Sequence, residues 1–144
     1  MYNNRIYKNG IKVSDVGSIA GTEVSVFGAL VNANDVVSAT KGDLTVSCTK
    51  NASGNYATSR LVFSTARNVY YSFSYRYDAA TNVGRTDNDT VASISLQTDM
   101  GYTRGNTLHG IVVDKTNQIM YQVAIACGNN GTSGRADWAA ISIK

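Results

Sequence analysis

Alternating apolar and polar positions are clearest in residues 60–78. Aromatic rings occupy every second position in the later part of this stretch, at Tyr71, Phe73, Tyr75 and Tyr77. This period of two is typical of a β-strand with one buried face. Leu61 and Phe63 share the spacing, and residues 65–68 between the two runs are short enough for a hairpin loop. We therefore expect an aromatic β-hairpin over residues 60–78 at the centre of the core.

The same alternation recurs in shorter segments separated by turns rich in Gly, Asn, Asp and Ser. The expected strands cover residues 24–26, 29–31, 44–49, 91–97, 108–113, 119–127 and 137–143. Residues 78–90 form the longest polar stretch and are expected to be a loop. Many short strands with regularly spaced turns predict an all-β protein, an antiparallel β-sandwich of the jelly-roll type.

Two aromatic residues are predicted to face outward. If Ile141 and Ile143 face the core, the alternation places Trp138 on the opposite face with Ala140 and Ser142. Tyr70 lies on the polar face of its own strand by the same argument. Outward aromatic side chains often mark interfaces, so we expect Tyr70 and Trp138 to contribute to a subunit interface.

Residues 1–20 are predicted to form an N-terminal arm, and residues 21–144 a single β-sandwich domain. The arm contains a short hairpin pattern over residues 6–13 around Asn9-Gly10, a strong two-residue turn signal. Two-stranded ribbons are marginally stable alone in water, so the hairpin is expected to pack on another surface. That surface is either its own domain or a neighbouring subunit. The expected partner-binding residues are Arg5, Ile6, Tyr7, Lys8, Ile11 and Lys12.

Composition and charge limit the classes of function that fit this chain. The 144 residues include no proline and thirteen glycines, and are poor in strong helix formers, in agreement with an all-β chain. The formal net charge is only +3, with the excess of basic residues in the first half. This is too little for a nucleic-acid binder, which usually carries a dense basic stripe, and a weakly acidic protein partner fits better. No apolar run is long enough for a membrane span, and the N-terminal residues do not resemble a signal peptide.

Candidate chemistry is sparse. His109 is the only histidine, and no nucleophile, base or phosphate-binding motif accompanies it, so we expect a structural residue and no enzyme. Asp87 and Asp89 are close in sequence, but the glycine and distal glutamate of a calcium loop are missing. We expect no cofactor and no metal. Cys48 and Cys127 each fall on the apolar side of a strand and are expected to be buried, reduced thiols, although a bridge between them stays open if their strands adjoin.

Residues 42–78 suggest a family resemblance. A serine- and threonine-rich strand and an Asn-containing loop precede the run LVFSTARNVYYSFSY, and the chain closes on the strand 138–143. This arrangement resembles the small β-domains of tailed-bacteriophage virion proteins. The resemblance covers about a third of the chain. It implies a trimeric β-sandwich that serves either as a capsid decoration (cement) protein or as the receptor-binding tip of a tail fibre.

Of these two roles, decoration is the better match. No repetitive shaft or coiled-coil heptad precedes the predicted sandwich, and most aromatic rings lie in strands, whereas a sugar-binding tip would gather them in loops with Asp and Asn. We therefore expect a homotrimeric structural protein on the capsid surface of the virion, bound to the major capsid protein. A carbohydrate-binding fibre tip is the alternative, and an unrecognised hydrolase is a distant third.

Overall fold

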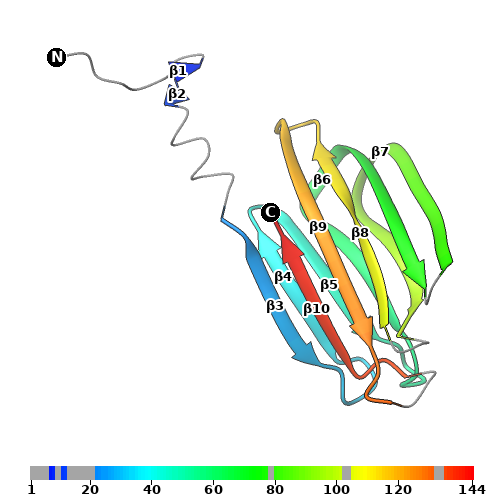
Figure 1. The fold of residues 1–144 in the computed structure, drawn as a ribbon. Coiled ribbons are helices and arrows are strands. Elements are labelled where there is room, and N and C mark those ends of the chain that lie inside the picture. The colour runs from blue at the N-terminus through cyan, green and yellow to red at the C-terminus, as the bar shows by residue number, and fades with distance from the viewer. Residues whose placement is uncertain (1–6, 9–10, 13–21, 78–79, 102–104, 132–134) are drawn as a thin grey trace.

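Every secondary-structure element in the described part of the chain is a β-strand (Figure 1). The computed structural model describes residues 7–8, 11–12, 22–77, 80–101, 105–131 and 135–144. The strands are β1 (Tyr7–Lys8), β2 (Ile11–Lys12), β3 (Val24–Ala29), β4 (Val36–Lys41), β5 (Leu44–Lys50), β6 (Ala57–Tyr77), β7 (Ala80–Met100), β8 (Gly105–Asp114), β9 (Ile119–Gly128) and β10 (Trp138–Ile143). These residues include no helix that is long and apolar enough to cross a membrane. The prediction of an all-β protein is confirmed.

The strands from β3 onward form one antiparallel sheet. Its order is β3-β10-β9-β8-β6-β5-β4, with β7 paired to β6, and it curls into a nearly closed, barrel-like shape. β1 and β2 form a separate two-stranded sheet, in which Tyr7 lies opposite Lys12 and Lys8 opposite Ile11. The expected pairing within the arm is therefore present. The antiparallel arrangement is also confirmed, while the barrel-like closure does not by itself confirm a sandwich.

The sheet comes close to closing where β3 approaches β4. A Cβ atom added to Gly28 of β3 would lie 2.7 Å from Cγ2 of Val37 on β4, so a larger residue would push the strands apart. Just beyond β3, the Leu30 amide donates a hydrogen bond to the Asp137 carbonyl at 2.9 Å. Close packing thus brings β3 near β4, and this bond ties the end of β3 to the segment before β10.

The barrel interior is filled by residues at alternate positions of each strand. On β6 the inward set comprises Leu61, Phe63, Val69, Tyr71, Phe73 and Tyr75. This is the aromatic face that the alternation predicts. Gly110 on β8 leaves room for it, because an added Cβ would lie 2.9 Å from the ring of Phe73 and 1.9 Å from the Ser72 carbonyl. Cys48 and Cys127 are also buried and free, as predicted.

The expected hairpin over residues 60–78 is wrong, because residues 60–77 belong to a single strand, β6, and residue 78 lies outside the described residues. Residues 57–63 pair with β5, and residues 69–77 pair with β8. Between them, the Ser64 amide donates to the Asp43 carbonyl at 3.2 Å, and the Lys115 amide donates to the Asn68 carbonyl at 2.8 Å. The backbone thus finds partners on two different neighbours and continues without a turn.

The polar stretch at residues 78–90 also differs from expectation, since residues 80–90 belong to β7 and residues 78–79 lie outside the described part. β7 pairs with β6 along both halves, from Ala57 opposite Met100 to Tyr77 opposite Ala80. Its register shifts between Val62 and Arg67, where β6 changes its other neighbour. A polar sequence can form an edge strand because the backbone supplies the pairing, so composition alone was a poor guide.

Candidate functional site

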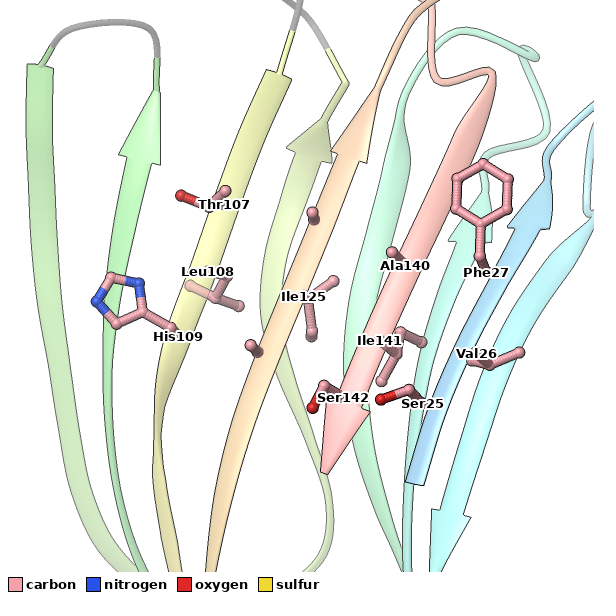
Figure 2. Close-up of a pocket in the computed structure, with 12 residues that line it drawn as sticks. Ser25, Val26, Phe27, Thr107, Leu108, His109, Ile125, Ala140, Ile141 and Ser142 are labelled. Carbon is pink, nitrogen blue, oxygen red and sulfur yellow. The ribbon is translucent and has the colours of Figure 1, made fainter. Parts of the chain in front are cut away.

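An open groove of about 660 Å³ runs over the outward side of the wall formed by β3, β10, β9 and β8 (Figure 2). We call it the outer groove. The side chains that face it come from alternate positions of these strands and are Ser25, Phe27, Thr107, His109, Ala124, Ala126, Ala140 and Ser142. The inward neighbours of these residues fill the core. The groove therefore follows from the same period of two that builds the interior.

Small side chains make the floor of the outer groove. In the middle of the wall, Ala140 of β10 pairs with Ala126 of β9, and Ser142 pairs with Ala124. Methyl and hydroxymethyl groups rise little above a pleated sheet, so larger side chains on the flanking strands leave a hollow between them. The result is an apolar strip of sheet that a partner can approach closely.

Two stacked rings form one end of the groove. The ring of Phe27 lies 6.0 Å from that of Trp138, centroid to centroid, with an interplanar angle of 30°. Phe27 is 72% exposed, and Trp138 is half-buried. The outward orientation predicted for Trp138 is confirmed by the alternating burial of β10. Its stacking partner was not singled out from the sequence, although alternation with Val24 and Val26 places Phe27 on the outward face.

Glu23 and two serines form a polar margin of the groove. The Glu23 carboxylate accepts hydrogen bonds from the Ser142 hydroxyl at 2.6 Å and the Ser25 hydroxyl at 2.9 Å. The Nζ of Lys144 lies 3.4 Å from the same carboxylate. These contacts, the Ser142 bond first, lower the pKa of Glu23 below its ordinary value. The two hydroxyls are thereby held in fixed orientations between β3 and β10.

His109 lies at the opposite side of the groove, on the outward face of β8. A second hollow of about 370 Å³ continues from it past Ile111 and Gln122 toward Lys144. The described residues contain no group of three or more His, Cys, Asp or Glu side chains that could hold a metal ion. Asp87 and Asp89 belong to β7, but their side chains are not among those that the structure describes. The groove thus offers apolar contact, ring stacking and hydrogen bonding.

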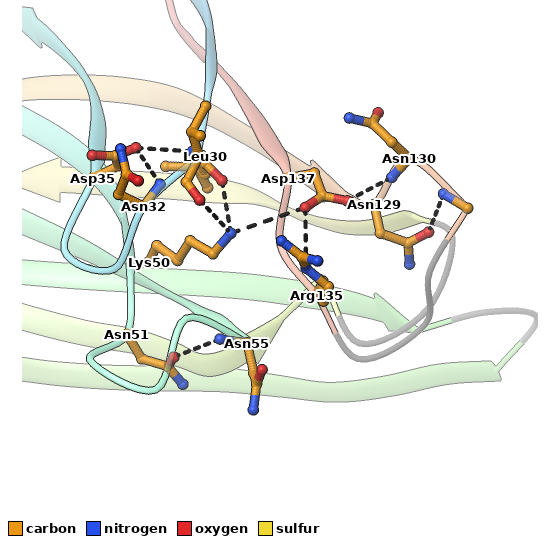
Figure 3. Close-up of polar contacts among 12 residues, drawn as sticks. Leu30, Asn32, Asp35, Lys50, Asn51, Asn55, Asn129, Asn130, Arg135 and Asp137 are labelled. Atoms are coloured by element: carbon orange, nitrogen blue, oxygen red, sulfur yellow. Dashed lines mark hydrogen bonds and ion pairs between the residues drawn. The ribbon is translucent and has the colours of Figure 1, made fainter.

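A polar cluster closes one end of the barrel and serves the fold (Figure 3). Lys50 is only 1% exposed, and its Nζ donates to the Leu30 carbonyl at 2.8 Å and lies 3.9 Å from the Asp137 carboxylate. Asp137 also accepts from the Asn130 amide at 2.8 Å.

Asp35 belongs to the same end of the barrel and accepts from the Val31 and Asn32 amides at 2.8 and 2.7 Å. Because the polar groups of the two sets are hydrogen-bonded, the cluster acts as a clamp, that is, it holds the strand ends together.

A second polar cluster lies where β6 changes partner. The Nε of Arg67 is 3.3 Å from the fully buried Asp114 carboxylate, and its Nη2 is 2.5 Å from Asp43. Asp114 also accepts from the Asn117 amide at 3.0 Å. Burial, followed by the charge of Asp114, raises the pKa of Tyr121. Arg67 thus provides a positive charge for the buried Asp114 carboxylate at the point where β6 changes partner.

The predicted interface residues do not form one patch. Tyr70, 36% exposed, pairs with Val113 of β8, which in turn pairs with Met120 of β9. Trp138 instead pairs with Gly128, eight residues farther along β9 than Met120. At roughly 3.3 Å per residue, the two rows are about 26 Å apart along the strands. Any single interface that includes both rings must therefore span most of the wall.

The arm residues cannot be placed against this surface. Arg5 and Ile6 lie outside the described residues, and only the backbone pairing of Tyr7, Lys8, Ile11 and Lys12 is described. Their role in partner binding stays a prediction. No protein-family model, curated protein or solved structure matches this chain.

Proposed function

We propose that this protein is a structural binding module that docks on other protein subunits through the outer groove, and that its role is capsid decoration. The observation that carries the proposal is the stacking of the exposed Phe27 on the half-buried Trp138, beside a floor of small side chains. A 72% exposed phenylalanine costs solubility unless something covers it, and rings at a concave apolar surface are typical anchors of protein interfaces. The resemblance of residues 42–78 to phage virion domains supplies the virion context.

The finer fold assignment belongs to the same proposal. β6 pairs with β5 through residues 57–63 and with β8 through residues 69–77. A strand that changes partners in this way can belong to two layers, one containing β4 and β5 and the other containing β8, β9, β10 and β3. A two-layer jelly-roll-type sandwich is therefore compatible with the pairing. In this arrangement the outer groove occupies the solvent side of the larger layer.

A homotrimer is part of the proposed assembly. Trp138 on β10 and Tyr70 on β6 lie far apart along the strand direction, so one can cover a sister subunit while the other contacts the capsid. The arm, residues 1–20, is proposed to dock on a neighbouring capsid or decoration subunit. Its basic residues Arg5, Lys8 and Lys12 would mainly steer association toward an acidic surface, an effect that weakens with salt.

The docking test uses Phe27→Asp, which places a charge at the centre of the aromatic anchor. Val62→Asp is the matched control, because Val62 is an exposed apolar residue of β6 that does not line the groove. Capsids lacking the protein are mixed with each variant and sedimented. We expect the wild type and Val62→Asp to saturate the capsids, and Phe27→Asp to bind at least tenfold more weakly. Equal binding by Phe27→Asp would exclude the groove as the docking surface.

The arm is tested separately by deleting residues 1–13. The sheet begins at β3, so the truncated chain is expected to keep its strand content by circular dichroism while losing capsid binding. Unchanged affinity of the truncated protein would show that the hairpin is only an edge element. Light scattering at micromolar concentration checks the trimer, and a monomer would contradict it.

Carbohydrate binding at a tail-fibre tip is the second candidate. It is favoured by one observation, the presence of three hydroxyl side chains, Ser25, Thr107 and Ser142, around an apolar floor with an exposed ring. Sugars combine an apolar face with many hydroxyl groups and suit such a surface. Immunogold labelling of virions distinguishes the roles, since decoration requires label over the head and a fibre tip requires label at the tail end.

A further inference from the structure

The barrel interior brings together the two cysteines of the chain. Cys48 faces inward from β5 and Cys127 from β9, and both are fully buried. Their strands are not neighbours in the sheet, since β8 and β6 lie between them in its order. Both thiols therefore point into the same interior from separate strands, an arrangement that period-two patterns along each strand do not reveal.

Several contacts hold the two cysteines near each other. The Cys48 thiol is hydrogen-bonded with the Cys127 thiol, and this bond, followed by burial, raises the pKa of Cys48. Lys50, the next inward residue of β5, has its Nζ 3.9 Å from the Asp137 carboxylate. The Asp137 amide in turn donates to the carbonyl of Gly128, next to Cys127, at 2.8 Å. The polar clamp at the barrel end thus ties the ends of β5 and β9 together just beyond the cysteines.

We propose that Cys48 and Cys127 are a latent disulfide site, which a small disulfide oxidant such as oxidised glutathione converts into a bridge between β5 and β9. One thiolate attacks the oxidant, forming a mixed disulfide and releasing one glutathione thiolate. The second thiolate attacks the protein sulfur of that mixed disulfide and releases the other. Two protein thiols are oxidised to one disulfide, the oxidant is reduced to two thiols, and the two protons pass to the released thiolates.

The environment of the pair makes the reaction slow in the folded protein. A thiol with a raised pKa is rarely ionised, and a buried one is out of reach of the oxidant. Bridging must therefore proceed through transient opening of the barrel. Low concentrations of urea, below the unfolding midpoint, are expected to accelerate it. Once formed, the bridge encloses residues 49–126 and restricts the unfolded chain.

The experiment equilibrates the full-length chain in mixtures of oxidised and reduced glutathione and follows intact mass. The expected product has lost two hydrogens, about 2 Da, with a Cys48–Cys127 cross-link in non-reducing peptide maps. The thermal midpoint of the bridged form should exceed that of the reduced form by roughly 5–15 °C. The double variant with Cys48→Ala and Cys127→Ala should show no dependence of its midpoint on the redox buffer.

The single variants Cys48→Ala and Cys127→Ala separate bridging from simple accessibility. Each keeps one thiol, so the mixed disulfide cannot resolve and a persistent glutathione adduct should accumulate. Each variant is compared with itself in the two redox states, so a loss of stability caused by the substitution does not affect the result. A stable glutathione adduct on the wild type, the absence of any bridge after unfolding and refolding with oxidant, or a lower midpoint of the bridged form would overturn the proposal. This inference is independent of the docking function.

Discussion

The two sides of the wall formed by β3, β10, β9 and β8 share a backbone and differ in every other respect. The inward side carries large branched residues that are almost fully buried, among them Val123, Ile125, Ile141 and Ile143. The outward side carries alanines and serines, with one pair of stacked rings at its end. Alternate positions of the same strands thus have different roles. The inward residues stabilise the fold, and the outward residues shape a surface.

The largest expected difference between the sides is in stability. Ile141→Ala removes a side chain that is 2% exposed and leaves a cavity, so the free energy of unfolding should fall by about 2–5 kcal/mol. Ala140→Ser, one residue away on the outer side, should change it by less than about 0.5 kcal/mol. Urea denaturation of both variants measures the contrast. Similar losses would mean that the outer side also carries folding energy.

Lys50→Met extends the comparison to the polar clamp at the barrel end. The substitution keeps most of the apolar stem but leaves the Leu30 carbonyl without its donor and Asp137 without its buried cation. The expected loss is about 1–3 kcal/mol. Lys115→Met, at an exposed turn position, is the control and should be nearly neutral. If the Lys50 variant unfolds at the wild-type denaturant concentration, the clamp does not stabilise the barrel.

Phe27→Asp should cost less than either inner substitution, because its ring is mostly exposed in the isolated chain. The loss of stacking on Trp138 should lower the free energy of unfolding by roughly 0.5–1.5 kcal/mol. Capsid binding of the same variant should fall at least tenfold. A folded protein with impaired binding is the signature of a docking surface. A variant that fails to fold would show that the ring stack is needed for folding.

Glu23 gives the smallest expected effect. Its pKa is lowered in the folded protein, so its hydrogen bonds contribute stability above the ordinary pKa of 4.5, and this contribution is lost as the pH falls through the lowered folded value. The side chain is solvent-exposed, which keeps the contribution small. The stability difference between wild type and Glu23→Gln should therefore shrink on acidification below about pH 4.5. If the stability difference between wild type and Glu23→Gln grows in acid, the pKa of Glu23 is not lowered in the folded protein.

Alternation was a reliable guide to faces and a poor guide to connections. It correctly placed Tyr71 and Phe73 inside and Trp138 outside, because side-chain direction in a strand depends only on position along it. The hairpin predicted around residues 65–68 is wrong, since Arg67 and Asn68 pair with β7, and the Asn68 carbonyl also accepts a hydrogen bond from the Lys115 amide in the turn after β8. Those partners are distant in sequence, so the pattern of the local residues does not predict them.

The amino-acid sequence by itself determined that the chain is all-β, which faces of its strands are apolar, and that both cysteines are buried. Only the tertiary structure decided that Phe27 stacks on Trp138, that Tyr70 lies far from that stack, and that Cys48 meets Cys127. The reason is that strand pairing joins segments through backbone hydrogen bonds that any residue except proline can make. Local pattern therefore fixes the direction of a side chain, while the order and register of the strands decide which side chains meet.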